Sequence, residues 1–254
     1  RIFPWNHANC GDLNLSGERR PQSYLRETLW SDAPVSHIVV TPPVPSFPLN
    51  PDKADWSVWN FPDVVDHWNF PGYEGKKMTV SVYSNCEQVE LFLNGESLGK
   101  QENTADKKNT LVWEVPYAHG ILKAVSYNKG GEVGTATLES AGKVEKIRLS
   151  ADRTEIVADG NDLSYITLEL VDSKGIRNQL AEELVAFSIE GDATIEGVGN
   201  ANPMSIESFV ANSRKTWRGS NLLVVRSGKS SGRIIVTATV KALPVASITI
   251  TQKK

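Results

Sequence analysis

Side chains that could carry acid–base or nucleophilic chemistry are dispersed along this chain. The histidines have no Ser or Cys at triad-like spacing and no second His within a helical turn; they are His7, His37, His67 and His119. Glu87, Glu90 and Glu96 flank a predicted β-hairpin, where surface glutamates are usually solvated charges. We therefore expect no catalytic residue and no cofactor among these 254 residues.

The acidic run Asp159-Gly160-Asn161-Asp162 raises the question of a calcium site. It lacks the D-x-[DN]-x-[DN]-G-x5-E register of an EF-hand loop. Asp and Asn side chains also bond their own backbone in turns, which is the commoner use of such a segment. A turn is the favoured interpretation, and no metal site is predicted.

Aromatic residues form the one group that could bind a ligand. Five of the seven tryptophans precede residue 70, and they are Trp5, Trp30, Trp56, Trp59 and Trp68. Flat rings stack on the apolar faces of sugars and offer contact area at low entropic cost. The alternative is that they bury a junction between domains. As candidate substrate-binding residues we take Trp5, Trp56, Trp59 and Trp68.

Composition narrows the class of protein. A net charge of −3 without a clustered basic stripe argues against a nucleic-acid partner. No apolar run approaches the ~20 residues that span a bilayer, so no membrane insertion is expected. Cys10 and Cys86 fall in different predicted units, which favours two separate thiols over a disulfide.

One helix is predicted, over PQSYLRETLWSD, residues 21–32. Pro21 suits a first helical turn because its missing N–H would be unpaired there anyway. Tyr24, Leu25, Thr28 and Leu29 would share one face. A single short helix before a β-type chain has little of its own to pack on, so we interpret it as the end of a domain that lies upstream.

The rest of the chain has the alternation of β-strands. Six of the thirteen prolines lie in residues 34–51, which predicts an extended connector, with Ile38–Val40 as an edge strand. Asn94-Gly95 predicts a hairpin turn. Short strands with turn signals every 8–12 residues then continue on both sides of a break at Ser140–Gly142, a pattern typical of β-sandwiches.

The predicted fold is therefore all-β, with two tandem immunoglobulin-like β-sandwiches after a short helical stub. We place the stub at 1–33, the first sandwich with its proline-rich lead-in at 34–141, and the second sandwich at 142–254. No Cys…Trp…Cys pattern is present, so antibody-type domains are not expected.

Several motifs resemble glycoside hydrolase family 2, the family of β-galactosidases and β-glucuronidases. CGDLNLSGERRPQSYLRETLW, from Cys10 to Trp30, looks like the end of its (β/α)8 catalytic barrel, with Asn14 where an acidic residue is common. The stretch Trp68–Lys100 and the WxVPYxxGxLxAxxY pattern at Trp113–Tyr127 are similar to the sandwich that follows the barrel. Residues 151–175, Gly197–Pro203 and Trp217-Arg218-Gly219 resemble the final Ig-like domain.

This resemblance implies a function for the parent protein. A retaining glycosidase needs two carboxylates about 5–5.5 Å apart, and in the family both are glutamates on earlier barrel strands. The chain would then be the non-catalytic C-terminal part of a β-galactosidase-type hydrolase, inactive alone, with the barrel of the same polypeptide as its partner and a carbohydrate substrate bound by the parent. Such enzymes commonly act in the periplasm or outside the cell. The alternative is a non-catalytic carbohydrate-binding or surface-adhesion Ig-like module.

Overall fold

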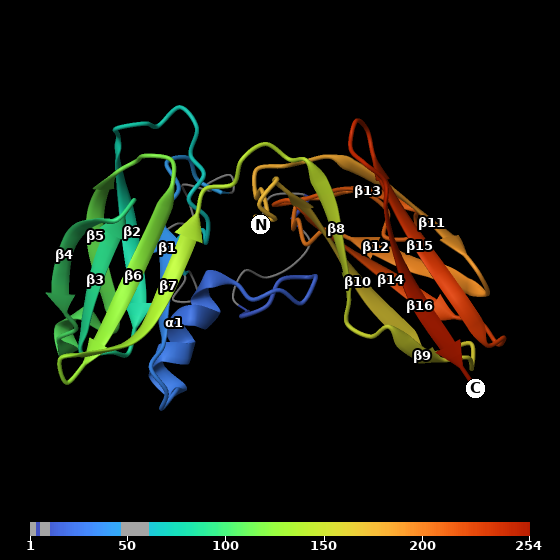
Figure 1. The fold of residues 1–254 in the computed structure, drawn as a ribbon, viewed down its shortest axis with the longest axis horizontal. Helices are drawn as coiled ribbons and strands as arrows, with labels where there is room; N and C mark the ends of the chain where they lie inside the picture. The colour runs from blue at the N-terminus through green and yellow to red at the C-terminus, as the bar shows by residue number, and fades with distance from the viewer. Residues whose placement is uncertain (1–3, 6–10, 47–60) are drawn as a thin grey trace. The chain divides into compact units, whose positions relative to one another are not determined.

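The computed structural model describes residues 4–5, 11–46 and 61–254. They divide into two compact units, with the division between Ser140 and Ala141. The first unit holds a helix and a β-sandwich, and the second holds a β-sandwich (Figure 1). The predicted all-β fold with one short α-helix is confirmed.

Helix α1 comprises Pro21–Trp30, inside the segment predicted to be helical. Proline occupies its first turn, as expected from the fixed φ of that residue. The helix ends where Ser31 takes extended backbone, and the Ser31 N–H still donates to the Glu27 carbonyl at 2.9 Å. Nowhere in the described residues is there a helix with the length and apolar character to cross a membrane.

The first sandwich consists of two antiparallel sheets. One has the order β1-β2-β5 and comprises Ser36–Val40 (β1), Lys77–Ser84 (β2) and Thr110–Pro116 (β5). The other has the order β4-β3-β6-β7 and comprises Glu96–Glu102 (β4), Gln88–Leu93 (β3), Ile121–Asn128 (β6) and Gly131–Glu139 (β7). One turn of 3-10 helix, Ala105–Lys107, precedes β5.

Two local predictions for this sandwich are confirmed. Strand β1 contains Ile38–Val40 and lies at the edge of its sheet. Asn94 and Gly95 form the two-residue turn between β3 and β4, with φ of 52° and 88°. These positive φ values are what a tight hairpin turn requires, and Asn and Gly adopt them at little cost.

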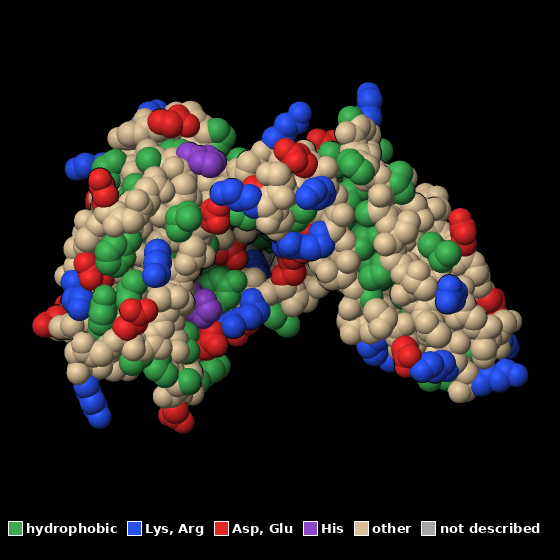
Figure 2. Space-filling model, viewed as in Figure 1, with side chains coloured by type: hydrophobic (Ala, Val, Ile, Leu, Met, Phe, Trp, Pro, Cys, Tyr) green, Lys and Arg blue, Asp and Glu red, His purple; other side chains and the backbone are tan. Residues whose placement is uncertain are grey.

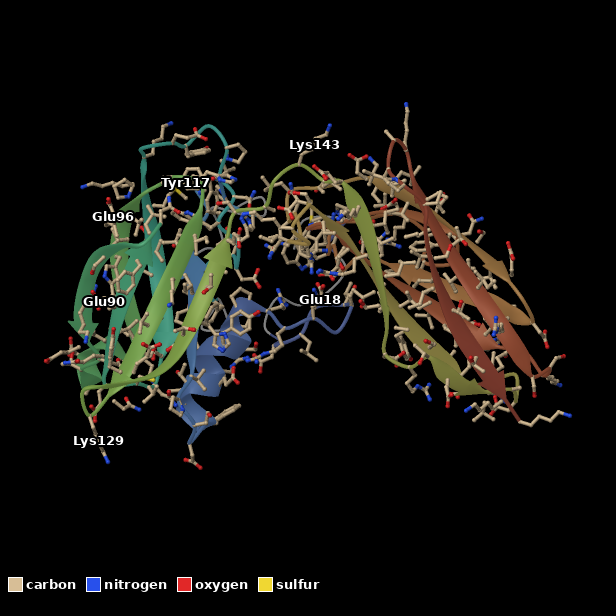
Figure 3. All side chains as sticks on the ribbon, viewed as in Figure 1. Glu18, Glu90, Glu96, Tyr117, Lys129 and Lys143 are labelled. Atoms are coloured by element: carbon tan, nitrogen blue, oxygen red, sulfur yellow. The ribbon has the colours of Figure 1, made fainter. Side chains whose placement is uncertain are left out.

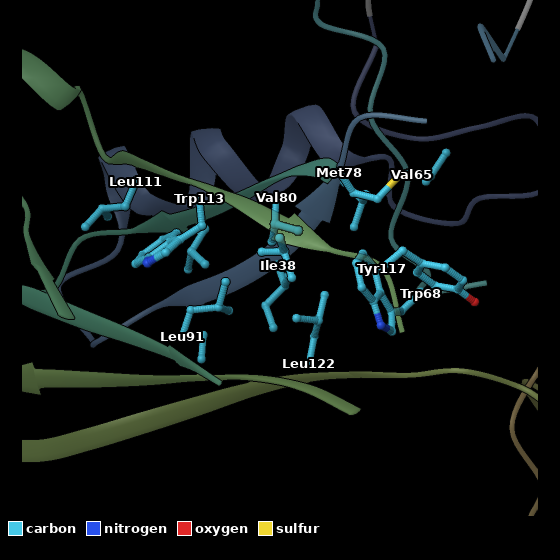
Figure 4. Packing of buried hydrophobic residues seen from close by; sticks show 14 of the residues in the cluster. Ile38, Val65, Trp68, Met78, Val80, Leu91, Leu111, Trp113, Tyr117 and Leu122 are labelled. Atoms are coloured by element: carbon cyan, nitrogen blue, oxygen red, sulfur yellow. The ribbon is translucent and has the colours of Figure 1, made fainter. Parts of the chain in front are cut away.

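The core of the first sandwich is built around Trp68. This side chain has 0% of its surface exposed, and its indole N–H donates to the Ala118 carbonyl at 2.8 Å. Its ring meets Phe70 and Tyr117 edge-on, at centroid distances of 5.9 and 4.9 Å. Figure 4 shows Trp68 and Tyr117 at one end of the core and Leu111 with Trp113 at the other, with Val80, Ile38 and Leu122 between them.

The second sandwich also consists of two sheets. One has the order β12-β14-β10-β8 and comprises Ala193–Gly199 (β12), Ser220–Ser227 (β14), Leu163–Val171 (β10) and Lys146–Ala151 (β8). The other has the order β13-β11-β15-β16-β9 and comprises Ser213–Lys215 (β13), Leu184–Glu190 (β11), Gly232–Val240 (β15), Ala246–Lys253 (β16) and Glu155–Val157 (β9). Ile166, Leu168 and Leu170 point from β10 into the core between them.

This unit differs from the sequence-based expectation in two places. The strands of an immunoglobulin-like sandwich pair antiparallel, but β9 and β16 pair in parallel. Strands β12 and β13 were not predicted. The two glycines of β12 weaken its strand pattern, and its pairing with β14 shifts register between Ile195 and Gly197. Strand β13 has three residues, too few to show an alternation.

The core position of Trp68 leads to a stability prediction. Trp68→Ala should lower the free energy of unfolding of the first unit by about 3–5 kcal/mol, because it opens a large cavity and leaves the Ala118 carbonyl unpaired. Trp30→Ala is the control: that side chain is 77% exposed, so its loss should change stability by less than about 0.5 kcal/mol. Urea titrations followed by far-UV circular dichroism measure both. Equal effects would show that Trp68 is not the centre of this core.

Candidate functional site

The structure describes two of the four candidate substrate-binding tryptophans, and these two differ in burial. Trp68 was predicted to contact substrate, and for this residue the prediction is wrong, since its buried ring has no surface to offer a sugar. Trp5 is half-buried and belongs to the compact unit that contains the second sandwich. Trp56 and Trp59 lie outside the described residues. Of the four, Trp5 is the one that the structure describes with part of its surface accessible.

The acidic side chains singled out from the sequence lie in turns and at the surface. Glu90 accepts a hydrogen bond from the Ser97 hydroxyl, and Glu87 accepts one from the Lys129 N–H. Figure 3 shows Glu90 and Glu96 on the hairpin strands of the first sandwich. Across the residues that the structure describes, no group of three or more His, Cys, Asp and Glu side chains could hold a metal ion.

The acidic run at Asp159 is a turn, as the sequence favoured. One Asp159 oxygen accepts the N–H groups of Asn161 and Asp162, each at 2.8 Å. These backbone hydrogen bonds, first that of Asn161, lower the pKa of the Asp159 carboxyl. Asp162 in turn accepts the Val157 N–H and pairs with Arg153 at 2.9 Å. The carboxylates are therefore occupied in closing the turn.

Residues 11–33 of the stub dock on the first sandwich through one side of α1. Tyr24 and Leu25 pack against Val39 of β1, Tyr83 of β2 and Val64. The Tyr24 ring stacks on His37 with centroids 4.3 Å apart and an interplanar angle of 12°. Its hydroxyl donates to Asp66 at 3.1 Å. Burial, reinforced by the Asp66 charge, raises the pKa of Tyr24 well above its usual range, so the phenol stays neutral.

Polar contacts hold the C-terminal end of the helix. The Asn109 amide donates to the Thr28 carbonyl and hydroxyl oxygens, both at 3.2 Å. The Asn85 amide donates to the Ser31 carbonyl at 3.0 Å and to the Ala33 carbonyl at 2.8 Å. The carbonyls of Thr28 and Ser31 are ones that a helix end leaves unpaired, and these side chains satisfy them. The direction of α1 on the sandwich is thereby fixed.

A chain of hydrogen-bonded side chains links the helix to β1. Glu27 accepts a hydrogen bond from Arg19 at 2.6 Å and contacts the His37 imidazole at 2.9 Å. The hydrogen bond from Arg19 is the main reason that the pKa of Glu27 is lowered, and His37 adds to it. All three side chains keep part of their surface in water, so the pairing contributes modestly to stability.

The loop before α1 is folded as well. Asn14 accepts the N–H groups of Ser16 and Glu18 on its side-chain oxygen, at 2.9 and 3.0 Å. The Gln22 amide donates to the Gly11 carbonyl at 2.6 Å, and Asp12 pairs with Arg26. Asn14, where the resembled family commonly has an acidic residue, thus closes a turn and plays no part in chemistry that the structure shows.

Some apolar residues of the stub remain exposed. Leu13 and Leu15 lie in the loop, while Leu29 and Trp30 end the helix with 61% and 77% of their surfaces exposed. Beside Trp30 is an open hollow of about 400 Å³, lined by Asp12, Arg19, Ser23, Arg26, Glu27, Trp30 and Ser31. Elsewhere on the face shown in Figure 2, acidic and basic side chains are interspersed and form no large patch of one charge.

Comparison with known proteins finds a family model for each of the two sandwiches. Residues 147–249 match the glycoside hydrolase family 2 C-terminal domain 5. Residues 75–134 match a model described as a domain of unknown function. A β-galactosidase of Bacteroides ovatus is 31% identical over 253 residues, which is 99% of this chain and 26% of that protein. A putative β-glucuronidase of Formosa agariphila is 28% identical over 80% of this chain and 17% of that protein.

A solved structure agrees with these matches. The crystal structure of a family 2 member from Bacteroides cellulosilyticus is 99% identical, with a TM-score of 0.98, and this chain covers 33% of it. The chain carries C-terminal domains of glycoside hydrolase family 2. It spans about a quarter to a third of the length of the Bacteroides ovatus relative and of the solved structure. The resemblance read from its motifs is thus confirmed.

Two of the motifs that indicated family 2 in the sequence lie in the matched C-terminal domain. The matched region 147–249 contains Gly197–Pro203 and Trp217–Gly219, two of the motifs on which the resemblance rested. The structure places the first of these at the end of β12 and the second before β14. Both are structural positions in a sandwich, which fits a non-catalytic C-terminal domain.

The Glu27 contacts predict a pH dependence. Because the folded-state pKa of Glu27 lies below its usual value of 4.5, its contribution is present above that pH and is lost as pH falls through the folded-state pKa. Glu27→Gln should therefore cost about 0.5–1 kcal/mol near pH 6 and progressively less toward pH 3. Urea midpoints of both proteins across this range measure the difference. Glu96→Gln, at the exposed hairpin, is the control; the same pH dependence there would contradict the assignment to Glu27.

Proposed function

We propose that this chain is the non-catalytic C-terminal part of a retaining glycoside hydrolase, and that its stub is the end of the catalytic barrel. The parent would hydrolyse O-glycosyl bonds of β-galactosides, with both catalytic glutamates on barrel strands that precede the stub. The Bacteroides ovatus relative, which matches over 99% of the chain, is named a β-galactosidase and supports the choice of sugar.

One observation carries the proposal: the sandwich covers α1 only in part, and the last turn of the helix is left uncovered. Tyr24 and Leu25 are packed on the sandwich, whereas Leu29 and Trp30 are exposed. An isolated helix of this length is marginal in water, so packing must stabilise it. The sandwich supplies part of that packing, and a barrel wall would supply the rest.

In this proposal the first sandwich supports the barrel and fixes its orientation. The helix is held by the Tyr24 and Leu25 contacts and by the amides of Asn85 and Asn109. A barrel that ends in this helix would be held in the same orientation. Active-site loops of such barrels lie at one face and need their strands in fixed positions, so the sandwich would contribute rigidity and no reacting group.

Two further parts of the proposal concern substrate and location. Trp5 lies before α1 with part of its surface accessible, and we propose that it contacts carbohydrate in the parent, together with Trp56 and Trp59. We also propose that the parent acts in the periplasm or outside the cell, as enzymes of this kind commonly do.

The chain by itself should hydrolyse no glycoside. Enzymes lower the barrier by about 8–23 kcal/mol, and a glycosidase does so largely through a positioned acid and nucleophile. Incubated with 4-nitrophenyl β-galactoside at high protein concentration, residues 1–254 should release nitrophenol no faster than buffer, while the full-length parent should turn over. Turnover that survives repurification of the chain would contradict the proposal.

The exposed end of α1 offers a second test. Leu29→Ser combined with Trp30→Ser should lower the stability of the full-length parent by about 2–4 kcal/mol, because both side chains would be buried against the barrel. The same double variant in residues 1–254 should change stability by less than about 0.5 kcal/mol. Val245→Ser, an exposed position of the second sandwich, is the control. Calorimetry measures all three, and equal effects in both lengths of chain would count against a barrel contact.

A further inference from the structure

The second sandwich carries a loop with an unusual anchor. Residues 200–212, which we call the Arg214 loop, connect β12 to β13. At its start, the buried Asn200 amide donates to the Lys215 carbonyl at 2.9 Å. At its end, the Phe187 N–H of β11 donates to the Asn212 carbonyl at 2.7 Å, and the Val198 N–H of β12 donates to the Phe209 carbonyl at 2.9 Å. The loop is thus tied to strands of both sheets.

Arg214 of β13 forms hydrogen bonds to the middle of the loop. Its side chain has 1% of its surface exposed. One terminal nitrogen donates to the carbonyls of Val198 and Glu207 at 3.2 and 3.1 Å, and the other donates to the Ser205 hydroxyl at 3.0 Å. The guanidinium also lies 4.3 Å from the centroid of the Phe209 ring. A buried charge is expensive unless it is paired, and the Glu207 carboxylate of the loop lies 3.9 Å from the Arg214 Nε.

The ordered loop presents apolar side chains to solvent. Ile206 and Val210 are 79% and 84% exposed, and Phe209 is half-exposed. None of the three belongs to the core cluster of the second sandwich. The core of the sandwich does not bury them, and the hydrogen-bonded loop holds them at the surface.

The size of this patch indicates what covers it. Three side chains offer at most about 750 Å² of contact, by the ~150–250 Å² that a large side chain buries. A stable interface between separate molecules takes about 800 Å² from each partner. A partner in the same polypeptide needs less, because tethering gives an effective concentration in the millimolar range. The related proteins supply such a partner, since this chain covers 26% of one and 33% of another.

We propose that the Arg214 loop packs Ile206, Phe209 and Val210 on an apolar surface of the catalytic part of the same polypeptide. The inference rests on the proposed function, which supplies that catalytic part. Arg214 is a positioning residue in this arrangement, because it acts through the loop that it orders.

Hydrogen exchange measured by mass spectrometry tests the contact. Amides of residues 204–212 should exchange at least about tenfold more slowly in the full-length parent than in residues 1–254, because the covered loop opens less often. Ile206→Ser combined with Val210→Ser should remove most of this difference while leaving exchange in the isolated chain unchanged. Val245→Ser is the matched control and should leave the difference intact.

Each other outcome has a defined meaning. Equal exchange in both lengths of chain would overturn the inference, even in a fully active enzyme, so its failure is distinct from failure of the proposed function. Protection that grows with protein concentration, with a dimer in sedimentation, would overturn it in favour of a second copy. Arg214→Lys keeps the charge but loses the planar fork, and it should speed exchange of the loop in the isolated chain as well. Unchanged exchange there would contradict the positioning role of Arg214.

Discussion

The packing of α1 on the outer side of the β1-β2-β5 sheet is the interaction on which the first unit depends. Side chains of a strand alternate between its two faces. Ile38 and Val40 of β1 enter the core, so Val39 between them must face the other way. Tyr83 of β2 joins Val39 there, and Tyr24 and Leu25 of the helix cover both. Without the helix this sheet would expose an apolar strip, and without the strip the helix would have no support.

Polar groups around this contact convert packing into a defined orientation. Apolar contacts are non-directional, so Tyr24 and Leu25 alone would allow the helix to shift along the sheet. The bond from Tyr24 to Asp66, the Asn109 amide on Thr28 and the Asn85 amide on Ser31 permit one position. The proposed support of a barrel depends on this arrangement, because the orientation of α1 would fix the orientation of a barrel that ends in it.

In the second sandwich, by contrast, a buried charged side chain positions one segment of the chain. Most of its core is aliphatic, from Ile166 in one sheet to Val236 in the other. Arg214 lies beside this core as a buried charge, and its hydrogen bonds go to loop and strand carbonyls. In the second unit, burial at Arg214 therefore sets the shape of one loop, whereas in the first unit burial at Val39 and Tyr83 sets the position of one helix.

The sequence by itself determined the local elements, because their signals are local: Pro21 begins the helix, Asn94-Gly95 turns the hairpin, and period-two alternation marks most strands. Its motifs also indicated the family. Only the tertiary structure decided which side chains are accessible. An indole suits a sugar face and a protein core equally well, and Trp68 lies in the core because Phe70, Tyr117 and the Ala118 carbonyl surround it. Arg214, which looks like a surface charge in sequence, is buried because β12 and the loop after it close over β13, a contact between residues that no local pattern records.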